Sequence, residues 1–243
     1  MNLSELQQEI GRLLNDADNT RWSASILTTR INEAQTIVQG YTRALKTDDT
    51  LTPTANTQAV TLDADTMDII RVVIQRQDGD QFQLEGTTED DLDFDYPNWR
   101  NLDAGEPKAW FYKGSNQTLN LVPKPDANNA ISNGLIVTGI HKPPSLSASS
   151  DIPFNSNNQL VPYHMSIVHW VVAQCYLDDG TPEALAKSKF HRSGAMARPG
   201  EFETQIMRIL AQFDSPQVPT RIKFRLQGGR IGPYYPSKTN PLA

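Results

Sequence analysis

The stretch from Trp22 to Leu45 reads WSASILTTRINEAQTIVQGYTRAL and decides the fold. Its apolar side chains recur at alternating spacings of four and three residues, and they are Leu27, Ile31, Ala34, Val38, Tyr41 and Leu45. This period predicts an amphipathic helix of about six turns, with an apolar seam narrow enough for helix–helix packing. Ser23 is placed to cap its first turn.

More helices are predicted at both ends of the chain. Residues 3–17 place Leu6, Ile10, Leu13 and Ala17 on one face, which makes the N-terminus a helical hairpin. Helical patterns return over 163–177, then from Thr181-Pro182 to Phe190, and again after Pro199-Gly200. The last helix has an apolar face made of Phe202, Ile206, Ile209, Leu210 and Phe213.

The middle of the chain favours strands. A turn-rich segment spans 48–57, and the strands that follow it are predicted at 60–62, 69–75, 81–84, 108–112, 118–122 and 135–140. Gly114-Ser115-Asn116 marks a hairpin between two of them. The acidic run 89–95 is either a short helix or an exposed loop, and residues 145–160 form a Ser/Asn-rich connection.

This order predicts an α+β fold in three parts. Residues 1–47 and 161–214 form a helical bundle from both ends of the chain. Residues 48–160 form an inserted β-rich region with loops. Residues 215–243 form an extended basic C-terminal arm.

Composition excludes several classes of protein. No apolar run approaches the roughly 20 residues needed to cross a bilayer, and Met1 to Glu5 lacks the features of a signal peptide. We therefore expect a protein that is not exported and has no membrane partner. Cys175 is the single cysteine, so no intrachain disulfide is expected. Its apolar surroundings predict a small buried side chain rather than a nucleophile.

The net charge of -6 conceals a separation of sign. All 28 acidic residues and 17 of the 22 Lys and Arg residues lie in 1–214, a net charge of -11. Residues 215–243 hold the other five cations and no acid, a net charge of +5. Such a division between a body and a chain end is typical of an interaction tail.

Within the arm, residues 221–226 alternate cations with apolar side chains. An extended chain there would place three cations on one face and three apolar groups on the other. Prolines on both sides discourage a helix, and Tyr234 and Tyr235 add large anchors. The partner-binding residues that we predict are Arg221, Ile222, Lys223, Phe224, Arg225, Leu226, Arg230, Ile231, Tyr234, Tyr235 and Lys238.

Two other interpretations of the arm stay open. Residues 221–226 could instead be the last strand of the chain's own sheet, because chain ends are often tied down in this way. The five cations could also contact nucleic-acid phosphates. Alternating aliphatic side chains suit a protein groove better than a phosphate stripe, so a protein partner is favoured, with Gly228 to Leu242 as the reaching portion.

Catalytic motifs are not evident in the sequence. His164 and His169 are five residues apart and lie on different faces of a helix, unlike the metal pair of a zincin. The acidic run 89–95 lacks the pattern of a calcium loop, and a solvated face or an interface is its favoured interpretation. Gly228 to Gly232 lacks the context of a phosphate loop. We predict a protein that is not an enzyme and needs no cofactor or metal.

In the order of its motifs, the chain resembles the head-to-tail adaptor proteins of tailed bacteriophages. Trp22 to Gln35 is similar to their second helix, with its INEAQ run. Leu62 to Val72 is similar to their L-P-A-D…I-R-V passage, although Asp63 stands where that family has proline. The other matching stretches are Gly105–Tyr112, Leu119–Pro125, Tyr163–Leu177 and Asp179–Phe190.

The resemblance implies a structural virion protein at the head–tail junction, assembled in the cytoplasm of the host bacterium. It implies a homo-oligomeric ring of twelve subunits that docks on the portal protein through C-terminal arms. Downstream tail or nozzle proteins would bind below the ring, and packaged DNA would pass through its lumen. The alternatives are another neck or tail-completion subunit, a DNA-binding module acting through the arm, or a metal-dependent hydrolase using Asp90, Asp91, Asp93 and a histidine.

Overall fold

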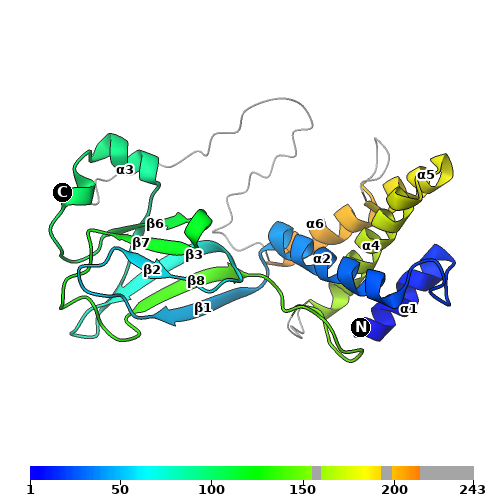
Figure 1. Cartoon of the computed structure of the whole chain (residues 1–243), viewed down its shortest axis with the longest axis horizontal. Helices are drawn as coiled ribbons and strands as arrows, with labels where there is room; N and C mark the ends of the chain where they lie inside the picture. Colours follow the sequence, from blue (N-terminus) through cyan, green and yellow to red (C-terminus); the bar gives the residue numbers. More distant parts are fainter. Residues whose placement is uncertain (155–159, 193–198, 214–243) are drawn as a thin grey trace. The chain divides into compact units, whose positions relative to one another are not determined.

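A computed structural model describes residues 1–154, 160–192 and 199–213 of the chain. Helices and strands are both present, so the predicted α+β class is confirmed. The chain divides into two compact units. The helical unit consists of Met1–Leu45 and the described part of Lys142–Ser215, and the β unit consists of Lys46–His141. Figure 1 labels the α-helices and most of the strands of the two units.

The first helix, α1 (Leu3–Leu14), ends earlier than the expected 3–17. Asn15 follows it in the left-handed region with a φ of 56°, which stops the helix. The Asp16 carboxylate then accepts backbone N–H bonds from the following turn, including one from Trp22 at 2.8 Å. That bond is the main cause of a lowered pKa for Asp16. A local side-chain acceptor therefore takes the place of the last helical turn.

The second helix, α2 (Ala24–Thr42), carries the predicted seam. The Ser23 hydroxyl accepts the capping bond, as expected. The four fully buried seam residues are Leu27, Ile31, Ala34 and Val38. Tyr41 is 44% exposed, and Leu45 lies beyond the end of the helix, so the seam is shorter than predicted. Arg43 ends the helix in the left-handed region, with a φ of 51°.

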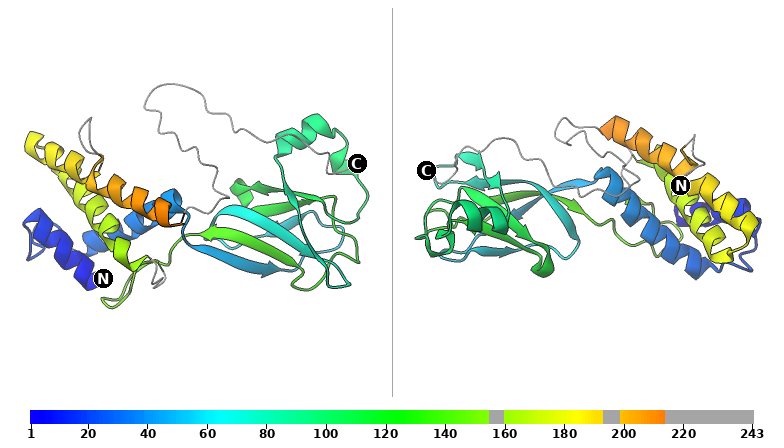
Figure 2. Two further views of the ribbon diagram at one scale, coloured as in Figure 1. Left: turned by 180° about the vertical axis from the view of Figure 1, so that it is seen from behind. Right: turned by 90° about the horizontal axis from the view of Figure 1, so that it is seen from above.

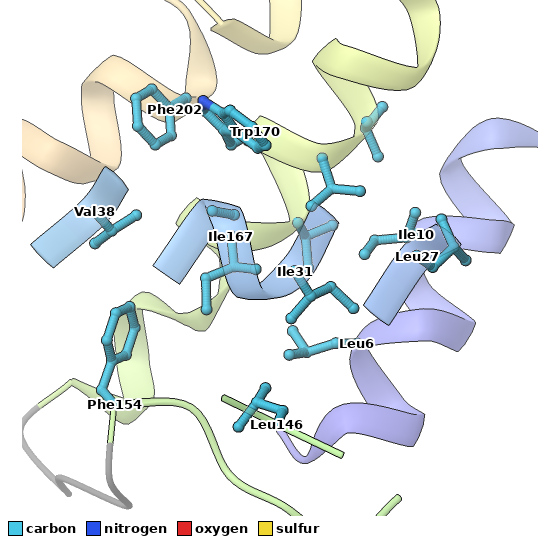
Figure 3. Close-up of a cluster of buried hydrophobic side chains, with 14 of the residues drawn as sticks. Leu6, Ile10, Leu27, Ile31, Val38, Leu146, Phe154, Ile167, Trp170 and Phe202 are labelled. Carbon is cyan, nitrogen blue, oxygen red and sulfur yellow. The ribbon is translucent and has the colours of Figure 1, made fainter. Parts of the chain in front are cut away.

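The later helices pack around α4 (His164–Asp179), which follows a short 3-10 turn, Val161–Tyr163. Helix α4 is in contact with each of the other four helices of the unit, α1, α2, α5 (Pro182–Arg192) and α6 (Glu201–Phe213). Its buried residues lie all round the helix, as expected for one enclosed by neighbours. Figure 3 shows the core that results, with side chains from α1, α2, α4 and α6 in one cluster.

The segment from Lys142 to Phe154 belongs to the helical unit, whereas the sequence placed it within the β-rich region ending at 160. Leu146 and Phe154 are buried in the helical core (Figure 3). The Asn32 amide on α2 bonds both backbone groups of Leu146, at 3.1 Å to its oxygen and 2.8 Å from its nitrogen. The buried side chains of Leu146 and Phe154 and the hydrogen bonds of Asn32 thus hold this polar connecting segment against the helices.

The β unit contains two four-stranded sheets, ordered β1-β8-β3-β4 and β2-β7-β6-β5. Their strands are β1 (Lys46–Leu51), β2 (Ala59–Thr61), β3 (Thr66–Gln75), β4 (Gln81–Gln83), β5 (Glu85–Gly86), β6 (Ala109–Lys113), β7 (Thr118–Val122) and β8 (Leu135–His141). One core receives side chains from both sheets, including Val72 of β3 and Leu121 of β7. All strand pairs are antiparallel except β5 with β6. Figure 2 shows these strands from behind and from above.

Six predicted strands are confirmed, but β1 and the two-residue strand β5 were missed. The sequence placed Lys46 and Thr47 at the end of the helical part and the rest of β1 in the turn-rich segment 48–57, because five of the six residues of KTDDTL are polar. In the structure it lies at the edge of its sheet and pairs only with β8, from Lys46 opposite Ile140 to Leu51 opposite Leu135. An edge strand exposed along most of its length needs no apolar alternation, and tertiary pairing overrides its low strand propensity.

The seam of α2 offers a matched test of the helical core. Ile31→Ala removes a fully buried side chain and should lower the free energy of unfolding by about 2–5 kcal/mol. Ile26→Ala, on the same helix but 42% exposed, should cost well under half as much. Urea denaturation followed by far-UV circular dichroism measures both. Equal losses in the two variants would contradict the assignment of the seam.

Candidate functional site

The predicted partner-binding residues lie outside the described part of the chain. They are Arg221, Ile222, Lys223, Phe224, Arg225, Leu226, Arg230, Ile231, Tyr234, Tyr235 and Lys238. Their roles therefore stay predictions. The described residues nevertheless contain four notable groups of side chains: an acidic helix with a groove beside it, a histidine–carboxylate cluster, a histidine pair and a buried thiol.

The acidic run left open by the sequence is a helix, α3 (Glu89–Asp95). The Thr88 hydroxyl caps it by accepting a bond of 3.1 Å from the backbone N–H of Asp91. Carboxylates in the first turn also suit the positive end of a helix. Leu92 faces the interior, while Phe94 is 84% exposed. A short acidic helix therefore presents a large apolar side chain to solvent.

The Arg100 guanidinium organises the carboxylates beside α3. It contacts Asp93, and a second bond of 3.0 Å reaches Glu89. Asp93 also accepts a bond of 2.7 Å from the indole N–H of Trp99. The Arg100 bond is the main reason why the pKa of Asp93 lies below its usual value. Arg100 covers the Trp99 ring at 4.3 Å, so cation–π contact adds to the ion pairs.

These contacts bear on the hydrolase interpretation. Asp91 and Asp93 are engaged with Thr88, Trp99 and Arg100. In residues 1–154, 160–192 and 199–213, no three His, Cys, Asp or Glu side chains are grouped so that they could hold a metal ion. Asp91 and Asp93 thus contribute to the local structure of α3 and the turn that follows it.

A groove of about 600 Å³ opens beside α3. Its apolar walls come from Tyr96, Pro97, Trp99, Leu102 and Pro123. Its polar residues are Asp95, Asn98, Asp103 and Lys108. Leu102 is 38% exposed there, whereas Trp99 is 4% exposed. No sequence motif marks this groove, although Phe94, set between two aspartates, was a signal of an exposed apolar side chain.

A second group joins the first and last strands of the β unit. His141 at the end of β8 places its Nε2 2.9 Å from an Asp49 oxygen on β1. Its Nδ1 lies 3.2 Å from an oxygen of Asp65. Burial raises the pKa of Asp49. One imidazole thus lies between a carboxylate of the polar edge strand and the carboxylate of Asp65.

The histidines of the helical unit form a third group. His169 and His191 bring their Nδ1 atoms to 3.1 Å and stack at 5.3 Å between ring centroids. Burial lowers the pKa of His169, and it lowers that of His191 to about 4. His164, on another face of α4 as predicted, is buried, and its pKa is also lowered to about 4. The pairing of His169 with His191 could not be predicted from the sequence, because it depends on the turn that brings α5 back against α4.

The Cys175 thiol lies in the helical core, 1% exposed. Burial raises its pKa to about 12, so the thiolate is strongly disfavoured at neutral pH. The predicted small buried side chain is confirmed. No helix in the described ranges is both long and apolar enough to span a bilayer.

The described residues form two compact units that present the groups of side chains described above. The comparison with known families supplies the class. Residues 1–220 match the SU10 adaptor protein family, so the chain belongs to that family of bacteriophage adaptor proteins, which are structural components of the virion neck. The resemblance found in the sequence is therefore confirmed. A search of curated proteins found no match.

The buried histidines predict an acid-sensitive helical unit. Their folded pKa values lie below the unfolded value of about 6.5, so the unfolded state binds more protons as the pH falls from about 6.5 to 4. Stability should be complete above this window and decline within it, by up to about 1.4 kcal/mol per pH unit for each histidine. Urea denaturation at a series of pH values measures the slope.

His191→Phe provides the control for this slope. It removes one titrating group while keeping a ring against Tyr176, which stacks on His191 at 6.1 Å. The stability of this variant should depend less steeply on pH than that of the parent. An unchanged slope would show that the histidines do not carry the effect.

Proposed function

We propose that this protein is a ring-forming adaptor that docks on the portal and connects the phage head to the tail. Membership of an adaptor family supports a neck position. The observation that carries the docking mode is the separation of charge, with all 28 acids before residue 215 and five cations without an acid after it. A charged arm speeds association with a partner surface of opposite sign and adds specificity for it.

The units would divide the work of assembly. The helical unit supplies the body for lateral contacts in a ring of twelve copies, because α4 packs against α1, α2, α5 and α6. The arm becomes ordered on the portal, which adds contacts at the cost of ordering the chain. Downstream tail or nozzle proteins bind the assembled ring, packaged DNA passes through its lumen, and assembly takes place in the host cytoplasm.

Deletion of residues 216–243 tests the docking mode. Every residue of the described cores lies before Ser215, so the shortened protein should fold with a thermal midpoint close to that of the full chain. Its attachment to purified portal rings should be lost in gradient sedimentation and in electron micrographs. Attachment of the shortened protein to portal rings would refute the arm as the docking element.

Two shorter changes locate the docking portion. Deletion of residues 228–242 should abolish attachment if the distal arm reaches the portal. Joint replacement of Arg221, Lys223 and Arg225 by Gln should weaken attachment less and reduce its dependence on salt. The opposite order of effects would assign docking to 221–226. Binding of the full chain to tail proteins but not to portal rings would favour another neck or tail-completion subunit.

A further inference from the structure

The groove beside α3 has the character of a docking surface. Tyr96, Pro97, Trp99, Leu102 and Pro123 give it apolar walls, and the Trp99 indole N–H donates a hydrogen bond to Asp93. Phe94 stands on the same short helix with 84% of its surface exposed. Exposed aromatic side chains beside a preformed apolar groove are typical of sites that bind a partner segment.

Charge narrows the choice of occupant. Residues 89–103 contain six acids and one cation, a net charge of -5. Arg100 is committed to Glu89 and Asp93, and Lys113 lies 3.6 Å from Glu89. Among the described residues, Asp90 and Asp103 form no ion pair. The surface around the groove therefore favours a cationic occupant, with Lys108 as the one cation that lines the groove.

One segment of this chain has the complementary chemistry. Residues 215–243 carry five cations and no acid, a net charge of +5 against -5. The same segment holds Tyr234 and Tyr235 between Pro233 and Pro236. Proline-rich segments dock in grooves lined by aromatic side chains, because their extended conformation is already restricted before binding.

We propose that the groove beside α3 binds the basic C-terminal segment of this protein, residues 221–238, when no other partner holds it. The tyrosines enter the apolar groove and pack against Phe94, and the cations lie over Asp90, Asp95 and Asp103. The surface thus stores the arm and shields Phe94 from solvent until a competing partner releases it. This inference does not depend on the portal, because it concerns the free protein.

Carbodiimide cross-linking of the full-length protein tests the proposal. This reagent joins a lysine to a carboxylate in direct contact, and the arm contains the two lysines Lys223 and Lys238. Mass spectrometry should find them linked to Asp90, Asp95 or Asp103. Phe94→Ser leaves every one of these reacting groups in place. It should reduce the yield roughly tenfold, as expected for losing the burial of one aromatic side chain.

Matched controls separate the groove from general attraction. Met207→Ser removes an exposed apolar side chain, 53% accessible, from α6 in the helical unit and should leave the yield unchanged. Replacement of Arg225 and Arg230 by Gln keeps both lysines and should lower the yield. The thermal midpoints of Phe94→Ser and the parent should agree, since Phe94 is outside the core.

Three outcomes would overturn the proposal. Equal linkage of the arm lysines to Asp78 and Asp80, on an exposed turn of the same unit, would mean that acids attract the arm without a specific site. A yield that Phe94→Ser does not change would remove the apolar groove from the interaction. Absence of any arm cross-link to residues 89–103 would leave the groove for a different occupant. If the protein did not bind the portal, these cross-links would still be expected, because they form in the free protein.

Discussion

The enclosure of α4 is the constraint on which the helical unit depends. A helix with Ile167, Val171 and Val172 fully buried cannot be stable alone in water, so it requires apolar partners on every side. Two of its partners, α1 and α2, come from the start of the chain, and two more, α5 and α6, follow it. This core can therefore be completed only when α1 and α2 pack against the later helices. The residues between Lys46 and His141 fold as a separate unit.

Local sequence signals predicted most elements but not all their neighbours. The seam of Leu27, Ile31, Ala34 and Val38, and the cap at Ser23, were legible because helix period and capping act within a few residues. Strand β1 was not legible, because its stability comes from β8, more than eighty residues away in the sequence. The placement of Leu146 and Phe154 in the helical core was hidden for the same reason, since a distant Asn32 holds that connection.

The interaction surfaces show the same difference between features that the local sequence reveals and features that depend on distant residues. The charge separation and the alternation of residues 221–226 can be read directly from the sequence, so the arm is identifiable without a structure. The groove beside α3 could not be read in this way, because Pro123 and Lys108 reach it from segments outside the acidic run. The stacking of His169 on His191 likewise needs the fold of α4 against α5. Charge is a property of composition, whereas a groove and a stacked pair are properties of geometry.

The pairing of β1 with β8 also bears on how such a chain could diversify. Lys46 lies opposite Ile140, so the chain enters and leaves the β unit one strand spacing apart. The contacts of His141 with Asp49 and Asp65 link the two ends of the β unit, and all three residues belong to that unit. To the helical unit, the whole insertion is equivalent to a short loop. Evolution or an engineer could therefore replace the β unit with another domain whose two ends lie equally close together. The seam of α2 would remain unchanged.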